Sequence, residues 1–216
     1  MKQISESIEK MFSDRELQDD EYRNEADNLI YCSKCNTPRQ HHVAVLGKEM
    51  IVPVPCQCQK ELRDKEEAEH KQREFLEQVS RLKSNGLQDK ALREYTFAND
   101  KGYNPEMQKA HDYVAHWEEM KARSIGLLLW GDVGTGKSFF AGCIANALLE
   151  QGIPVLMTNF SRILNSLSGM YSDEKNQFID SLNKHSLLII DDLGIERSTE
   201  FALEQVFNVI DSRYRS

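Results

Sequence analysis

The segment Gly131–Ser138, which reads G-x-x-x-x-G-K-S, constrains this chain more than any other part of its sequence. It follows the apolar run Ile125–Trp130 and precedes a segment with helical character. Glycines here let backbone N–H groups turn toward an anion, and the following helix adds the positive end of its dipole. Lys137 can reach the β- and γ-phosphates of a nucleotide, and the Ser138 hydroxyl can ligate Mg²⁺. A chance glycine-rich turn would not combine the lysine, the hydroxyl and the preceding apolar run, so the segment predicts binding of a nucleoside triphosphate. The predicted nucleotide-binding residues are Gly131, Asp132, Val133, Gly134, Thr135, Gly136, Lys137 and Ser138.

From Leu87 onward, apolar runs of strand length alternate with helical segments. The predicted strands are Ile125–Trp130, Ile153–Thr158 and Leu187–Ile190. The predicted helices cover Pro105–Lys121, Lys137–Gln151, Phe160–Tyr171, Asp173–Asn183 and Thr199–Arg213. On the last helix, the residues predicted to face inward are Leu203, Val206, Phe207, Ile210 and Tyr214. This alternation is typical of an α/β fold, in which right-handed βαβ connections build a parallel sheet flanked by helices.

Two acids, Asp191 and Asp192, follow the apolar run Leu187–Ile190. The carboxyl ends of parallel strands are where such sheets bind ligands. We therefore expect Asp191 to orient Mg²⁺ or its water together with Ser138, and Asp192 to polarise the attacking water as a general base. The alternative is that both acids cap the following loop. The predicted catalytic residues are thus Lys137, Asp191 and Asp192, and the predicted magnesium ligands are Ser138 and Asp191.

Four of the five cysteines form two closely spaced pairs, Cys32-x-x-Cys35 and Cys56-x-Cys58, with twenty residues between them. Two thiolates from each pair can complete a tetrahedron around Zn²⁺, which leaves no open coordination position and makes the site structural. The alternatives are unrelated thiols or two disulfides, which a reducing cytoplasm disfavours. The spacing predicts a zinc site that holds together a domain too small for a core of its own.

The remaining candidate ligands are assigned less specific roles. His41 and His42 lie between the cysteine pairs, and we expect them to be surface residues because four thiolates suffice for zinc. Cys143 lies in the helix after the phosphate loop and is predicted to be a small buried packing residue.

The chain divides by composition into four parts. We predict an N-terminal helical segment at 1–28, a zinc-binding domain at 29–59, a charged linker helix at 60–86 and a nucleotide-binding domain at 87–216. Helical spacing of Ile4, Ile8, Met11 and Phe12 suggests an amphipathic helix that packs on the adjacent domain or on a partner helix. A hairpin is expected between His42–Leu46 and Met50–Val54. The alternative for the linker is disorder, because its first half has few apolar residues to bury.

Net charge and the distribution of apolar residues narrow the classes of function that this chain can have. The formal net charge of −8 argues against broad electrostatic binding of nucleic acid but leaves room for a local basic strip or a protein partner. No apolar run approaches the ~20 residues that cross a bilayer, and the N-terminus lacks the apolar stretch of a signal peptide. We expect a cytoplasmic protein.

Several segments together resemble bacterial and phage helicase loaders of the DnaC/DnaI kind, in the AAA+ group that also includes the transposon-associated, IstB-like ATPases. The resemblance covers about Leu87–Ser216, and the cysteine domain is similar to that of the Gram-positive and phage members. The matching segments are Glu94–Phe97, Gly126–Gly131, Gly134–Ser138, Leu187–Glu196 and Ile210–Arg215.

The resemblance implies a P-loop AAA+ (ASCE) sheet, ATP and Mg²⁺ as cofactors beside Zn²⁺, and a protein of DNA replication. It implies that the N-terminal domain binds the replicative hexameric DnaB-like helicase and that the ATPase domain contacts single-stranded DNA during loading. Self-association is left open. Two other functions remain: a zinc-domain adaptor or inhibitor of helicase loading that does not hydrolyse ATP, and an ATPase associated with transposition.

The family pattern continues beyond the position where this chain stops, Ser216, with further strands, a residue that senses the γ-phosphate and an arginine supplied to the neighbouring subunit. We expect a truncated or split product, or a fragment, with a sheet that is incomplete at its C-terminal end. Ile125–Trp130 would then either pair directly with Leu187–Ile190 or leave a gap beside it. We also expect weak ATP hydrolysis by the chain alone.

Overall fold

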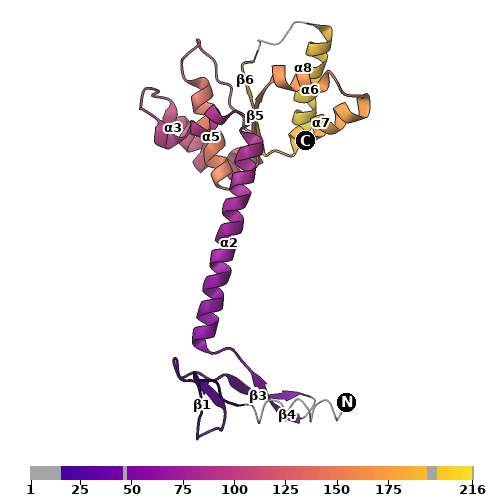
Figure 1. The fold of residues 1–216 in the computed structure, drawn as a ribbon. Coiled ribbons are helices and arrows are strands. Elements are labelled where there is room, and N and C mark those ends of the chain that lie inside the picture. Colours follow the sequence, from indigo (N-terminus) through magenta and orange to yellow (C-terminus); the bar gives the residue numbers. More distant parts are fainter. Residues whose placement is uncertain (1–15, 46–47, 194–198, 216) are drawn as a thin grey trace. The chain divides into compact units, whose positions relative to one another are not determined.

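The structure is a computed structural model, and it describes residues 16–45, 48–193 and 199–215. The chain forms two compact units, residues 1–73 and residues 74–216 (Figure 1). Helix α2, Gln57–Gly86, begins in the first unit and ends in the second.

The first unit contains two antiparallel strand pairs. Strand β1 (Glu21–Arg23) pairs with β2 (Ile30–Cys32), and β3 (Gln40–Val45) pairs with β4 (Lys48–Pro53). The second pair confirms the predicted hairpin. Among the described residues of this unit, few apolar side chains are fully or nearly fully buried: Leu29, Ile30, Cys32 and Cys56. A core this small cannot stabilise the unit by apolar burial alone, as the cysteine spacing suggested.

The N-terminal prediction is only partly covered by the described residues. Ile4, Ile8, Met11 and Phe12 lie outside them. At the other end of the segment predicted as helical, Glu21–Arg23 is strand β1, so the small β unit begins before residue 29.

The charged segment after the cysteines forms a helix, as predicted. Along α2 the side chains from Lys60 to Gln78 are exposed, and ion pairs four residues apart, such as Lys71 with Glu67 at 2.7 Å, line its surface. Mixed-sign charge at this spacing supports a helix without apolar burial. In the part of the chain that the structure describes, no helix has both the length and the apolar character needed to cross a membrane.

The second unit has the predicted α/β order. Its helices are α3 (Met107–Ala115), α4 (Trp117–Ala122), α5 (Lys137–Glu150), α6 (Phe160–Leu167), α7 (Ser172–Asn183) and α8 (Glu200–Arg215). Two short 3-10 helices, η1 (Lys90–Glu94) and η2 (Phe97–Asn99), precede them. Strand β5 (Val155–Asn159) pairs in parallel with β6 (Leu187–Asp191), with Asn159 opposite Asp191. The single helix predicted at Pro105–Lys121 is two helices that meet at His116.

Helices cover both faces of the parallel pair. Alternate residues of β5, Val155 and Met157, pack in one core cluster with residues of α5 and α3. Leu156, which points to the other face, packs in a second cluster with residues of α6, α7 and α8. Strands with apolar residues on both faces fit this arrangement, as expected for a parallel sheet.

The prediction of a buried strand at Ile125–Trp130 is wrong for this structure. The segment has no regular secondary structure, and Leu128 and Trp130 are 79% and 88% exposed. A strand is stable only when its backbone finds a partner, and in the described residues the parallel sheet consists of β5 and β6 alone. Direct pairing of this segment with β6 is therefore not seen.

The predicted inward face of the last helix is also wrong. Leu203, Phe207, Ile210 and Tyr214 are exposed, Val206 is half-buried, and the buried residues of α8 are Ala202, Gln205 and Val209. Polar contacts at the end of the helix explain its rotation. The amide of Asn183 donates to the Ser212 hydroxyl at 2.8 Å, and the Arg213 guanidinium donates to the Ser186 carbonyl at 2.8 Å. With residues 212 and 213 facing α7 and the loop after it, position 214 faces solvent.

Candidate nucleotide and metal sites

The predicted phosphate loop has the backbone that its glycines allow. Gly131, Gly134 and Gly136 have φ angles of 141°, 84° and 84°, values that residues with a Cβ adopt rarely and at a cost. Gly136 is the N-cap of α5, which begins at Lys137 as predicted. The loop thus enters the helix in the left-handed conformation, and the first N–H groups of α5 have no partner within the helix. This is the geometry that offers backbone donors to an anion.

Lys137 folds back over this loop. Its ammonium donates to the Gly131 carbonyl at 2.9 Å and to the Asp132 carbonyl at 2.7 Å, while the Thr135 hydroxyl donates to the Asp132 carbonyl at 2.9 Å. The positive charge therefore lies over the loop itself. A bound phosphate chain would compete with the two carbonyls for the same ammonium.

Asp191 lies at the same end of the sheet as the phosphate loop. Helix α5 packs against β5 and β6 and leads into β5 through the turn at Gly152, so it runs antiparallel to both strands. Its first residue, Lys137, is therefore nearest the carboxyl ends of the strands, where Asn159 is opposite Asp191. In the described residues no hydrogen bond joins Asp191 to Lys137 or Ser138.

The two acids differ in setting. Asp191 is half-buried, and one of its carboxylate oxygens accepts the Asp192 backbone N–H at 3.1 Å. Asp192 is exposed and has a positive φ of 54°, a conformation that Asp tolerates better than most residues. The local turn thus orients Asp191, whereas the Asp192 side chain faces solvent.

The donor chemistry of the loop suits a polyphosphate. The loop backbone and the Lys137 ammonium would provide donors for phosphate oxygens, and the Ser138 hydroxyl and the Asp191 carboxylate are the kinds of oxygen ligand that Mg²⁺ prefers. Bound Mg²⁺ would supply neutralisation of the charge that develops on the phosphates.

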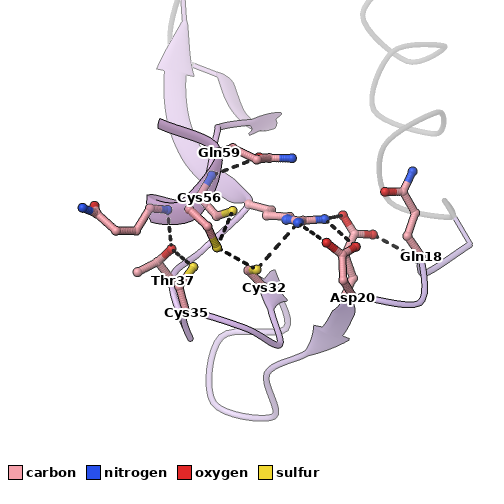
Figure 2. Close-up of polar contacts among 11 residues, drawn as sticks. Gln18, Asp20, Cys32, Cys35, Thr37, Cys56 and Gln59 are labelled. Atoms are coloured by element: carbon pink, nitrogen blue, oxygen red, sulfur yellow. Dashed lines mark hydrogen bonds and ion pairs between the residues drawn. The ribbon is translucent and has the colours of Figure 1, made fainter. Parts of the chain in front are cut away.

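The four predicted zinc ligands come together. The Sγ atoms of Cys32, Cys35, Cys56 and Cys58 all lie within 4.8 Å of one another. The sulfur of Cys58 is 3.6 Å from that of Cys32 and 3.8 Å from that of Cys56 (Figure 2). A Zn–S bond of about 2.3 Å in a tetrahedron places sulfurs about 3.8 Å apart, so the cluster fits Zn²⁺. All five cysteines are free, and none is in a disulfide.

Tight turns present the four thiols. Cys32 ends β2, and its carbonyl accepts the N–H of Asn36, which has a φ of 52°. Cys56 and Cys58 flank the first residue of α2, and the Cys56 carbonyl accepts the Lys60 N–H at 3.0 Å. The turn after β2 therefore positions the first cysteine pair, and the start of α2 positions the second. Residues 36–55 then have to bring these two elements together.

The thiols do not ionise alike. The Thr37 hydroxyl, 3.1 Å from the Cys35 sulfur, is the main cause that lowers the pKa of Cys35 to about 5. The contact with Cys35 is the main cause that raises the pKa of Cys58 to about 12. Neighbouring negative charges at this spacing oppose one another, so four thiolates can coexist here only with a cation among them.

Sequence reasoning missed the polar residues around this cluster. Arg39 is buried beside Cys32 and forms ion pairs with Asp20 at 2.7 Å and Glu21 at 2.9 Å. Hydrogen bonds to Asp20 are the main cause that raises the pKa of Arg39. The sequence contains only a weak signal for this network, because Arg39 lies four residues after Cys35 but the partner acids precede Cys32 by more than ten residues.

The other assigned residues lie where they were predicted. His41 and His42 are exposed, and Cys143, a residue of α5, is fully buried in the core. Burial is the main cause that raises the pKa of the Cys143 thiol to about 12.

The chain is similar to known proteins over the region that contains the phosphate loop. Residues 57–216 match the model of the family described as IstB-like ATP binding protein. The chain is 26% identical over 113 residues to the "Replicative helicase loader DnaC" of Escherichia coli (strain K12), which covers 51% of this chain and 45% of that protein. It is 31% identical over 102 residues to the "Putative insertion sequence ATP-binding protein y4iQ/y4nD/y4sD" of Sinorhizobium fredii (strain NBRC 101917 / NGR234), which covers 47% of this chain and 34% of that protein.

The chain thus spans less than half the length of these two relatives. No solved structure matches. The family match covers well over half of the chain, including the phosphate loop, β5 and β6. The chain belongs to the IstB-like ATP-binding protein family.

Proposed function

We propose that this protein is an ATP-binding replication factor that engages a replicative hexameric helicase and helps to load it on single-stranded DNA. The observation that carries the nucleotide part is the loop of three positive-φ glycines that ends at the N-terminus of α5, with the Lys137 ammonium lying over it. The helicase part rests on the similarity to the replicative helicase loader DnaC.

In this proposal each residue of the nucleotide site has one task. The loop N–H groups and Lys137 hold the phosphates, and Ser138 and Asp191 hold Mg²⁺. Asp192 orients the water that attacks the γ-phosphate. Hydrolysis by the chain alone is weak, because Ile125–Trp130 forms no strand in the described residues and the loop therefore lacks the support of a sheet on the side away from α5.

The cysteine unit has a separate task. Zn²⁺ held by Cys32, Cys35, Cys56 and Cys58 stabilises residues 16–58 as a small domain, and this domain binds the helicase.

The experiment has two parts. A fluorescent ATP analogue with Mg²⁺ is titrated into the full chain and into Lys137→Ala, with Lys121→Ala, an exposed lysine on α4, as the matched control. Hydrogen bonds to charged groups contribute about 1.5–3 kcal/mol, so Lys137→Ala lowers the affinity about 10- to 100-fold and the control does not. In the second part, the chain is mixed with a DnaB-like helicase, with and without ATP, and co-elution is followed by size-exclusion chromatography. Absence of co-elution in both conditions would refute the helicase part.

A second candidate is a zinc-domain adaptor that binds a replication protein without ATP turnover. The segment Ile125–Trp130 favours it, because most of it is exposed and it forms no strand in the described residues, and a loop without its strand is a poor catalyst. Helicase binding that is unchanged in Lys137→Ala and by ATP would support the adaptor over the loader.

A third candidate, an ATPase associated with transposition, is favoured by the similarity to the insertion sequence ATP-binding protein. It predicts ATP-dependent binding to duplex DNA in the absence of any helicase, and an electrophoretic mobility shift with the purified chain distinguishes it from the loader.

A further inference from the structure

The Arg39 guanidinium is a buried charge with several partners in the described part of the first unit. Its side chain is 8% exposed. Nη1 donates to Asp20 Oδ1 at 3.0 Å and to Glu21 Oε1 at 2.9 Å, and Nη2 donates to Asp20 Oδ2 at 2.7 Å and to the Cys32 sulfur at 3.6 Å. A guanidinium has four terminal N–H groups, so each of them has one acceptor here. Three acceptors are carboxylate oxygens, and the fourth is a predicted zinc ligand.

The backbone of Arg39 also connects the two parts of the cysteine cluster. Its N–H donates to the Ile30 carbonyl of β2 at 2.7 Å, two residues before Cys32. Its carbonyl accepts the Val54 N–H at 2.8 Å, two residues before Cys56. Arg39 therefore bonds to the chain beside one cysteine of each pair.

Thr37 makes a second, smaller connection of the same kind. Its hydroxyl lies 3.1 Å from the Cys35 sulfur and accepts the N–H of Gln57, the residue between Cys56 and Cys58, at 2.9 Å (Figure 2). Each cysteine of the first pair thus has a side-chain partner that also reaches the second pair or the chain leading to it.

We propose that Arg39 is the positioning residue of the metal site: its guanidinium, oriented by Asp20 and Glu21, donates to the Cys32 sulfur and holds both cysteine pairs at the spacing of a tetrahedral Zn²⁺ site. This inference rests on the zinc site of the proposed function. Groups that hydrogen-bond to metal ligands fix the ligands' orientation before the metal binds, and their removal commonly costs about 10- to 100-fold in metal affinity.

A purely structural ion pair is the competing explanation, and the contacts distinguish the two. If the ion pair only joined β1 to the loop after Cys35, the guanidinium would need no partners beyond the carboxylates of Asp20 and Glu21. Here the fourth terminal N–H is directed at a sulfur, and the remaining donor, Nε, is buried without a hydrogen-bond partner in the described structure. A buried donor beside thiols is stabilised when those thiols carry the negative charge of a metal site.

The test uses the full chain with zinc as the probe. Zinc content of the wild type and of Cys32→Ser is measured first, and then the zinc affinity of Arg39→Gln, Arg39→Lys and Asp20→Asn by competition with a chelating dye. Arg63→Gln, an exposed arginine on α2, is the matched control. We expect a loss of about 10- to 100-fold for Arg39→Gln, a smaller loss for Arg39→Lys and Asp20→Asn, and no change for Arg63→Gln.

A second readout separates positioning from general destabilisation. The zinc-loaded proteins are treated with iodoacetamide, and the modified cysteines are mapped by mass spectrometry. Loss of the N–H···S contact makes the Cys32 sulfur a better nucleophile, so Arg39→Gln accelerates alkylation of Cys32 more than that of Cys58. Equal acceleration at all four cysteines would overturn the proposal.

The remaining outcomes are also decisive. If the wild type binds no zinc, the zinc site and this inference both fail. If the wild type binds one zinc and Arg39→Gln binds it equally well, the zinc site stands and this inference fails. If Arg39→Gln does not fold, Asp20→Asn tests the proposal instead, because Asp20 orients the guanidinium from a partly exposed position. Unchanged zinc affinity and unchanged alkylation of Cys32 in that variant would overturn the proposal.

Discussion

Truncation of two residues on opposite sides of α8 tests which face of this helix packs against the rest of the second unit. Val209 is 2% exposed, whereas Phe207 is 65% exposed although its side chain is much larger. We expect Val209→Ala to lower the free energy of unfolding of this unit more than Phe207→Ala does. Tyr214→Ala, at a residue that is 90% exposed, serves as the control.

The magnitudes follow from burial. Val209→Ala removes two buried methyl groups, which costs about 1.6 kcal/mol in transfer at about 0.8 kcal/mol per group, and the cavity raises this to about 2 kcal/mol. A fully buried Phe→Ala costs about 3–5 kcal/mol, and at one-third burial Phe207→Ala costs about 1 kcal/mol. Valine and phenylalanine have similar helix propensities, so the gain from alanine cancels in the comparison. Tyr214→Ala stays within about 0.5 kcal/mol of the wild type.

Urea unfolding followed by tryptophan fluorescence measures these differences. Trp117 is buried in the core of the second unit and reports its unfolding, and a Trp130→Phe background removes the signal of the exposed tryptophan. Midpoints are compared at unchanged m-values. If Phe207→Ala proves more destabilising than Val209→Ala, α8 does not pack on its Val209 face, and the face expected from apolar spacing is the buried one.

Three further predictions concern the core of the same unit. Gly86→Ala destabilises this unit by several kcal/mol, because the new Cβ would lie 2.0 Å from the Val155 carbonyl oxygen. That oxygen belongs to the backbone of β5 and cannot move aside without disturbing the strand. Thermal unfolding measures the loss of stability. Asn146→Ala lowers the free energy of unfolding in urea by about 2–4 kcal/mol. The buried Asn146 amide donates to the carbonyls of Leu92 and Tyr95 at 2.9 and 3.0 Å, and its truncation also leaves a cavity. Asn165→Ala, at an exposed residue of α6, is the control. Cys143, whose thiol pKa is raised to about 12 by burial, stays unmodified by iodoacetamide at pH 8 in the native protein and reacts in urea; rapid native modification would contradict its burial.

Local sequence signals predicted the parts of the structure that depend on neighbouring residues. The phosphate loop needs glycines at fixed offsets before a helix, and the metal cluster needs two short cysteine spacings, so both are visible in a window of a few residues. Helix α5 and strands β5 and β6 were found within two residues of their ends, because each has a continuous apolar pattern between clear breaks such as Gly152.

Strand pairing and the polar contacts around the cysteine cluster could not be predicted from local sequence signals. An apolar run such as Ile125–Trp130 has the composition of a strand, but whether it becomes one depends on a partner elsewhere in the chain. The contact of Arg39 with Asp20 and Glu21 joins residues that are distant in sequence, and nothing in the spacing of either group marks the other.

The rotation of α8 shows the limit most clearly. Its apolar side chains occupy more than one face of the helix, since buried Ala202 and Val209 alternate with exposed Leu203 and Ile210. Spacing alone therefore identifies a helix without choosing which face is buried. The polar residues at the end of the helix determine which face is buried. Arg213 donates to the backbone carbonyls of Asn183 and Ser186, and these two hydrogen bonds form only when the helix has this rotation. A fully buried carbonyl without a donor costs about 1–3 kcal/mol, so even these half-buried carbonyls contribute an energy comparable with the apolar burial that either face offers. In a helix with apolar residues on two faces, polar contacts of this size decide which one is packed inside.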